Sequence, residues 1–203
     1  MKILAVQSRM GIGDTVIFLP FMKALFKKFN SPISILVKEN SKANQYLHQT
    51  KYIDKILTLE RDNKTNNRHG GFFGIFKLAN DLKKYKFDKI FIFNSSLRFN
   101  LVAKISGIPQ IYQYPLFAKN KQHIIEAPKK FLKENLNLDI NEDPEVQIDN
   151  DSISKAAQKF QIDKNTTNIL LGIGGSGPTK RIPAKTFLSV IDKISVSYTH
   201  LTL

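Results

Sequence analysis

The sequence contains no cysteine and no tryptophan. Without cysteine it has no disulfide framework, no thiolate metal site and no cysteine nucleophile. It also lacks an apolar run of about 18 residues, so we expect no membrane-spanning helix. The opening Met1–Gln7 turns polar too early for a signal peptide. These absences predict a cytoplasmic globular protein.

Arginine is also scarce, because only five of the 31 basic residues are arginine. The formal net charge is nevertheless +14. This excess favours an anionic partner, such as an acidic membrane surface or a phosphorylated substrate. A chain rich in Lys, Asn and Ile is equally typical of an AT-rich genome. Nucleic acid ranks below both interpretations, since proteins that read nucleic-acid sequence rely on the arginine fork.

Short apolar strands alternate with amphipathic helical segments along the chain. We expect strands at Met1–Val6, Ile33–Val37, Lys55–Leu59, Lys89–Phe93 and Asn168–Ile173. We expect helices at Asp14–Phe29, Ser41–His48, Ile75–Tyr85, Leu97–Ser106, His123–Asn135, Ser152–Phe160 and Ala184–Ile194. This alternation predicts an α/β fold with a Rossmann-like parallel sheet and flanking helices. Such sheets bind ligands beyond the carboxyl ends of their strands.

The organisation of the chain suggests two domains. Residues 1–150 are expected to form an N-terminal Rossmann-like domain. Residues 151–195 would supply a connector and the start of a second domain, because Gly172–Arg181 repeats the strand, glycine loop and helix of the N-terminus. Residues 196–203 resemble a translated sequencing adapter and are expected to be a non-native tail. The alternative for these last residues is a strand, which Val, Tyr and Thr favour.

The first candidate motif is Gly11-Ile12-Gly13-Asp14, which follows the first strand. Its two glycines let the backbone turn tightly and approach a ligand. Asp14 stands where a helix N-cap belongs, and the spacing alone favours this structural role. The functional alternative is a general base that accepts a proton from a substrate hydroxyl. The pattern is not the G-x-G-x-x-G of dinucleotide-binding loops.

The second motif is the glycine-rich stretch Gly172–Arg181, with Gly174 and Gly175 at its turn. Backbone N–H groups at such a turn suit a phosphate, and Lys180 and Arg181 add charge-assisted contacts. It differs from a Walker A loop because Pro, Thr and Lys follow Gly177. The alternative is a plain turn with two solvated cations. We favour phosphate binding, because glycines, a hydroxyl and two cations converge here.

Together these motifs resemble the bacterial heptosyltransferases of glycosyltransferase family 9, the ADP-heptose:lipopolysaccharide group. The resemblance rests on the opening Lys2–Leu25, with Gly13-Asp14 and Leu19-Pro20, and on Gly174–Pro183. Weaker matches occur at Phe87–Ile90, at Ser96-Leu97-Arg98 and at His123–Glu126. The similarity extends over roughly residues 2–194.

The resemblance implies the N-terminal half of a two-domain GT-B glycosyltransferase with facing Rossmann-like halves. Asp14 would deprotonate the acceptor hydroxyl, whose oxygen attacks the anomeric carbon and expels ADP with inversion. Ser176, Lys180 and Arg181 would bind the donor phosphates beside the loop glycines, and Arg98 and His123 would lie on the acceptor side. The resemblance implies no metal, and it implies no cofactor because ADP-heptose would be a substrate. Asp149-Asn150-Asp151 spells a D-x-D, which we interpret as a solvated or helix-capping acid pair.

The sequence departs from the family pattern in three places. The usual Asp-x-Gln-Gly is Phe93-Asn94-Ser95-Ser96, and the usual Trp before Pro183 is Ile182. The family's later Asp-Thr-Gly…His motif does not occur before the sequence ends. We therefore expect this polypeptide by itself to be an inactive fragment.

The implied partners are a nucleotide sugar and a lipid-linked glycan, with peripheral contact to the anionic inner face of the cytoplasmic membrane. Nucleic acid is not expected. The lysine-bearing helices could support the membrane contact, although solvated helix faces are the commoner explanation. Phe72–Phe76 is expected to be core, and contact with acyl chains is the alternative. Two rival functions remain: a non-catalytic basic module that binds anionic lipid or nucleic acid, and a nucleotide-dependent enzyme of another type.

Overall fold

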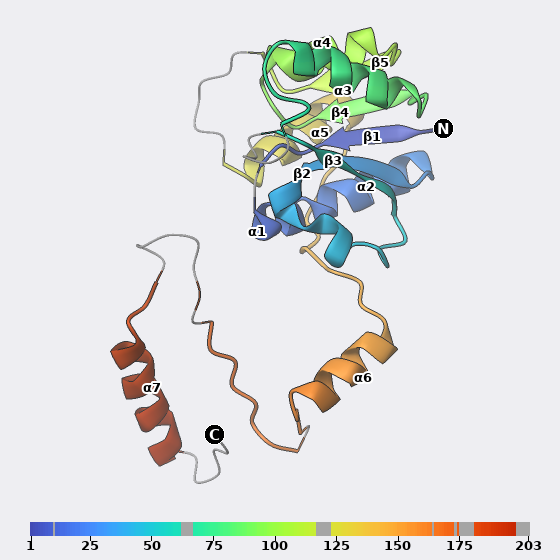
Figure 1. Ribbon diagram of the computed structural model, residues 1–203. Coiled ribbons are helices and arrows are strands. Elements are labelled where there is room, and N and C mark those ends of the chain that lie inside the picture. Colours follow the sequence, from blue (N-terminus) through green and yellow to red (C-terminus); the bar gives the residue numbers. More distant parts are fainter. Residues whose placement is uncertain are drawn as a thin grey trace. The chain divides into compact units, whose positions relative to one another are not determined.

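The computed structural model describes residues 1–9, 11–61, 67–116, 123–163, 165–172, 174 and 181–197. The chain divides into two compact units, Met1–Ser152 and Ile153–Leu203. The first unit contains the sheet and its covering helices (Figure 1). Residues 198–203 of the predicted tail lie outside the described residues, whereas the backbone of residues 196 and 197 belongs to the last helix.

The first unit is built on a five-stranded parallel sheet in the order β3-β2-β1-β4-β5. The strands are β1 (Ile3–Val6), β2 (Ile33–Lys38), β3 (Ile53–Leu59), β4 (Lys89–Ile92) and β5 (Gln110–Gln113). This confirms the predicted α/β fold class. Sequence reasoning missed β5, because its residues Gln-Ile-Tyr-Gln form no apolar run. Only pairing with β4 reveals this edge strand, through partners such as Ile90 and Ile111.

One face of the sheet is covered by α1 (Ile12–Ile17), α2 (Leu19–Phe29) and α5 (Glu126–Leu136). The predicted helix from Asp14 to Phe29 is broken at Phe18, where α1 ends, and Pro20 occupies the first turn of α2. The helix also begins earlier than predicted. Gly11 is the N-cap, so Asp14 is the third helical residue and the N-cap prediction for it was wrong.

The opposite face is covered by α3 (Phe73–Lys83) and α4 (Leu97–Ile105), which lie side by side (Figure 1). Side chains alternate between the two faces of a strand, so Leu4 and Val6 of β1 point to this side whereas Ile3 and Ala5 point to the other. With both faces covered, the strands read as continuous apolar runs. That is why β1, β2 and β4 were recognisable in the sequence, whereas β3 has only Leu59 buried and was recognisable by its apolar residues.

The predicted helix at Ser41–His48 is wrong. The segment forms two 3₁₀ turns, η1 (Glu39–Ser41) and η2 (Ala43–Gln45), separated by Lys42 in the left-handed conformation with φ of 48°. A left-handed residue cannot continue a right-handed helix. The apolar side chains Ala43 and Leu47 are nevertheless buried in the core, as an amphipathic segment requires.

The stretch after α5 packs against the first unit. Ile140 is buried, the Glu142 carboxylate accepts ion pairs from Lys27 and, at 2.9 Å, from Lys23, and Gln147 accepts a hydrogen bond from the Lys51 backbone. These contacts tie the connector to α2 and to the loop before β3.

Asp149 caps the helix that follows, α6 (Asn150–Lys159). Its carboxylate accepts hydrogen bonds from the Ser152 backbone N–H and hydroxyl at 2.7 and 2.8 Å, and these bonds lower the pKa of Asp149 to about 2. The helix-capping interpretation of the D-x-D pair is therefore confirmed for Asp149.

The second unit contributes α7 (Ala184–Ser197) and the end of α6. The strand predicted at Asn168–Ile173 is wrong over residues 168–172, which have no regular structure, and residue 173 lies outside the described residues. Leu170 is 98% exposed. A strand needs a neighbour for its backbone groups, and the described part of this unit contains no other strand.

None of the helices in the described residues is both long enough and apolar enough to cross a bilayer.

Candidate functional site

The sheet has a topological switch point between β1 and β4. From β1 the chain continues to β2 on one side, whereas β4 pairs with the other side of β1. Open parallel sheets bind ligands at such a point, beyond the carboxyl ends of the strands. The described residues of the loops that leave these two strands, 7–9, 11 and 93–96, are therefore the candidate site, which we call the β1/β4 crevice.

Polar side chains fix the shape of the β1/β4 crevice. Gln7 is buried directly after β1, where its side-chain amide donates to the Asp14 carbonyl at 3.1 Å and accepts from the Arg9 backbone N–H. Asn94, after β4, donates to the Ser8 hydroxyl at 2.8 Å and accepts from the Ser96 N–H at 2.7 Å. The two loops are thus joined to each other. Gln7 and Ser8 were missed as site residues, although a polar residue directly after a buried strand is a signal that could have found Gln7.

Asp14 is half-buried at the N-terminal turn of α1. Its Oδ2 accepts the Gly11 backbone N–H at 3.0 Å, which fixes the direction of the carboxylate. No hydrogen bond reaches Oδ1 from the part of the chain that the structure describes. One oxygen is therefore held and the other is available to a ligand. The capping interaction and the proposed base are compatible, because they use different oxygens.

The two loop glycines next to Asp14 have different surroundings. A Cβ added at Gly11 would lie 3.1 Å from Asp14 Oδ2, so any side chain there would press on the carboxylate. A Cβ added at Gly13 would meet nothing within 4 Å. Gly13 therefore leaves open space at the N-terminus of α1, next to the carboxylate.

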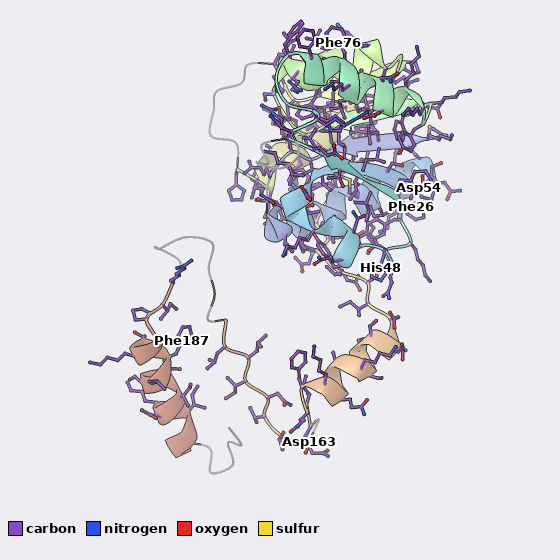
Figure 2. The ribbon with its side chains drawn as sticks, viewed as in Figure 1. Phe26, His48, Asp54, Phe76, Asp163 and Phe187 are labelled. Atoms are coloured by element: carbon purple, nitrogen blue, oxygen red, sulfur yellow. The ribbon has the colours of Figure 1, made fainter. Side chains whose placement is uncertain are left out.

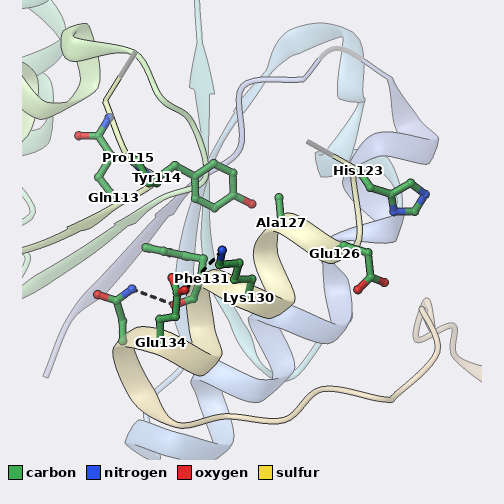
Figure 3. A pocket seen from close by; sticks show the side chains of 10 residues that line it. Gln113, Tyr114, Pro115, His123, Glu126, Ala127, Lys130, Phe131 and Glu134 are labelled. Atoms are coloured by element: carbon green, nitrogen blue, oxygen red, sulfur yellow. Dashed lines mark hydrogen bonds and ion pairs between the residues drawn. The ribbon is translucent and has the colours of Figure 1, made fainter. Parts of the chain in front are cut away.

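The predicted acceptor-side residues lie elsewhere in the first unit. The Arg98 guanidinium donates to the Gly71 carbonyl at 2.7 Å and to the His69 carbonyl, so it braces the loop before α3. His123 lines a pocket of about 550 Å³ between β5 and α5 (Figure 3). Their proposed role in acceptor binding stays a prediction.

Tyr114 connects this pocket to the β1/β4 crevice. It follows β5, lines the pocket with Glu126 and Lys130, and packs edge-on against Phe131 at 5.1 Å between ring centroids (Figure 3). Burial raises the pKa of the Tyr114 hydroxyl, although the positive charge of Arg9 opposes this shift. Tyr114 also packs edge-on against Phe93, the first residue of the loop after β4, at 5.9 Å between ring centroids, and this contact joins the pocket to the β1/β4 crevice.

Most of the predicted donor-binding residues cannot be placed. Gly175, Ser176 and Lys180 lie outside the described residues. Gly174 and Arg181 are described and exposed, and both belong to the second compact unit. The structure brings Gly11, Gly13 and Asp14 together within the first unit, and the donor-phosphate role of the others stays a prediction.

The structure also shows a buried histidine that the sequence did not single out. His69 Nδ1 accepts the Glu60 backbone N–H at 3.1 Å, so its Nε2 carries the proton and donates to Asp81 Oδ2 at 3.2 Å. Arg68 binds the same carboxylate with bonds of 2.8 to 3.0 Å. Both nitrogens of His69 are engaged, so we assign it a structural role rather than proton transfer.

We expect Asp81→Asn to destabilise the first unit by about 1–3 kcal/mol at neutral pH. Burial raises the pKa of Asp81, but hydrogen bonds from His69 and Arg68 outweigh it and hold the pKa below the ordinary 3.8. Because the folded pKa is depressed, this stabilisation is complete above the ordinary pKa and is lost as the pH falls through the folded one. The difference between the two proteins in urea unfolding should therefore shrink in acid.

The exposed pair of Asp139 and Lys133 provides the control for this measurement. Asp139→Asn should change the free energy of unfolding by less than about 1 kcal/mol. An Asp81→Asn protein as stable as the unmodified chain at neutral pH would contradict the structural role of the cluster.

Among the described residues, no group of three or more His, Asp and Glu side chains is arranged to hold a metal ion.

Several solved structures share the fold of this chain. The chain superposes on a glycosyltransferase family 9 protein from Veillonella parvula with a TM-score of 0.74 and 19% identity, over 96% of this chain and 60% of that one. It matches ADP-heptose lps heptosyltransferase II from E. coli with a TM-score of 0.63 and 17% identity, over 95% and 62% of the two chains. The E. coli heptosyltransferase WaaC, solved with ADP-2-deoxy-2-fluoro heptose, matches with a TM-score of 0.57 and 13% identity, over 97% and 66%.

These matches show that the chain shares the fold of the family 9 glycosyltransferases, as the sequence resemblance predicted. The chain spans about 60% of the length of the Veillonella protein. No family model matches the sequence. No curated protein matches it either.

Proposed function

We propose that this chain belongs to a glycosyltransferase that moves a heptose or a related sugar from an ADP-linked donor to a lipopolysaccharide-type acceptor, with inversion. The observation that carries the proposal is Asp14, a half-buried carboxylate with one oxygen available, at the switch point of the sheet. The shared fold supports it, since two of the three matched structures are named as heptosyltransferases and one of these was solved with ADP-2-deoxy-2-fluoro heptose.

In the proposed reaction the Asp14 carboxylate removes the proton of the acceptor hydroxyl. The hydroxyl oxygen then forms a bond to the anomeric carbon of the donor from the face opposite ADP. The bond from that carbon to the phosphate oxygen breaks, and ADP leaves with the bonding electrons. Ser176, Lys180 and Arg181 are proposed to bind the phosphates, where positive charge would stabilise the growing negative charge.

The proposed setting is the cytoplasmic face of the inner membrane, where the acceptor is a lipid-linked glycan. The experiment is a transfer assay with ADP-heptose and a lipid-linked acceptor, on a protein that carries these residues over the full length of the matched structures. ADP release and a shifted acceptor mass that both require acceptor and donor would support the proposal. Salt-sensitive binding to anionic vesicles or oligonucleotides without any transfer would instead support the basic binding module.

A further inference from the structure

Exposed apolar side chains lie on both α3 and α4. Three aromatic side chains come from the start of α3, and Phe72, Phe73 and Phe76 are 69%, 76% and 47% exposed. Figure 2 shows Phe76 at the outer surface of the layer that α3 and α4 form. The expectation that Phe72–Phe76 is core was therefore wrong for these three rings, and right only for Gly74 and Ile75 between them.

The neighbouring helix α4 also exposes apolar side chains. Leu97, Leu101 and Ile105 recur every four residues along α4, and each is more than a third exposed. This spacing places them on one side of the helix, whereas Phe99, Val102 and Ala103 face the core. We call these six exposed side chains the α3/α4 patch.

The charges around the α3/α4 patch are positive. Lys77 of α3 and Lys104 of α4 are exposed within the same two helices. The only acid in either helix is Asp81, whose carboxylate is bound by Arg68 and His69. An anionic bilayer offers an apolar interior and negatively charged headgroups. The apolar side chains and the lysines of this surface complement these two features, and little negative charge opposes them.

We propose that the α3/α4 patch docks this chain on an anionic lipid bilayer, with the phenylalanine rings in the interfacial region and the lysines among the headgroups. A soluble surface gains nothing from exposing three clustered phenylalanines, whereas burying them in lipid removes their apolar area from water. The lysines add electrostatic attraction that falls off within a Debye length of the surface.

The α3/α4 patch lies next to the site at which a lipid-linked acceptor is proposed to react. Leu97 directly follows Ser96, which caps α4 at the carboxyl end of β4. The patch therefore begins where the β1/β4 crevice ends. Docking would bring the crevice to the membrane surface, and this consequence rests on the proposed function. The docking itself does not depend on the proposed function, because vesicle binding is measured without any sugar or acceptor.

The test is cosedimentation of the full 203-residue chain with vesicles of phosphatidylcholine alone or mixed with an equal part of phosphatidylglycerol. We expect binding to the mixed vesicles, weakened by salt. Phe73→Ser combined with Phe76→Ser should lower the partition coefficient by about tenfold or more. Lys77→Glu combined with Lys104→Glu should lower it by a similar factor on the mixed vesicles only.

Phe160→Ser is the matched control, because Phe160 is 66% exposed but lies outside the patch. It should bind vesicles as the unmodified chain does, and circular dichroism should show all variants folded. Equal vesicle binding by the double serine variant and the unmodified chain would overturn the proposal. So would a concentration-dependent dimer that the serine variant abolishes while vesicle binding persists, because the patch would then bind a second copy of this chain.

Discussion

Asp14→Asn is expected to lower the rate of sugar transfer by about 10²–10⁴-fold, the usual contribution of a positioned general base. The amide oxygen can still accept the Gly11 N–H, so the loop should keep its shape. What is lost is the ability to take up the acceptor proton. The rate is measured with saturating donor and acceptor on the full-length protein described for the transfer assay.

Two further measurements separate chemistry from folding. Asp139→Asn removes an exposed carboxylate outside the β1/β4 crevice and should leave transfer unchanged. ADP binding, followed by calorimetry, should be the same with and without the Asp14 substitution. Undiminished turnover by Asp14→Asn would refute its assignment as the base, and loss of ADP binding would show that Asp14 acts on the donor instead.

Gly74→Ala is expected to destabilise the first unit by about 3 kcal/mol, at the upper end of the cost of overpacking. A Cβ at Gly74 would lie less than 3.0 Å from the carbonyl carbon and oxygen of His69 and from the Arg98 guanidinium. Two of these atoms are backbone and cannot rotate away. The His69 carbonyl also accepts a hydrogen bond from Arg98, so the loop before α3 and the Arg98 side chain would have to shift together.

Gly13→Ala is the matched control, because it makes the same substitution in a helix where a Cβ meets nothing within 4 Å. It should leave the protein as stable or raise the free energy of unfolding by up to about 1 kcal/mol, since alanine favours helix over glycine. Urea unfolding of both variants checks the pair. Equal stability of the two would show that α3 does not approach the His69 loop as closely as described.

The contrast between these glycines shows what the sequence could and could not predict. Gly13 stood out because it follows a buried strand and opens a helix, which is a local pattern. Gly74 looked like one more glycine in a run with Gly70 and Gly71. Its role depends on His69 and Arg98, and only the packing of α3 against that loop brings them together.

The same reason explains the errors in the element predictions. The strands β1, β2 and β4 were recognisable because their side chains are buried on both faces, and β3 was recognisable by its apolar residues although only Leu59 of it is buried, whereas β5 depends on pairing with β4. The aromatic run at Phe72–Phe76 carried no information on which side of α3 would be buried, because the packing of α3 against the sheet and α4 decides that.

The sequence by itself determined the alternation of strands and helices, the α/β fold class and the placement of Asp14 at the start of a helix after the first strand. These follow from local periodicity and from residue types, which a linear pattern contains. Only the tertiary structure decided that Gln7 and Asn94 lock the loops beside Asp14, that His69 is saturated by hydrogen bonds, and that Phe72, Phe73 and Phe76 face outward. Each of these depends on which distant segments meet, and that is set by the packing of the whole sheet and its helices.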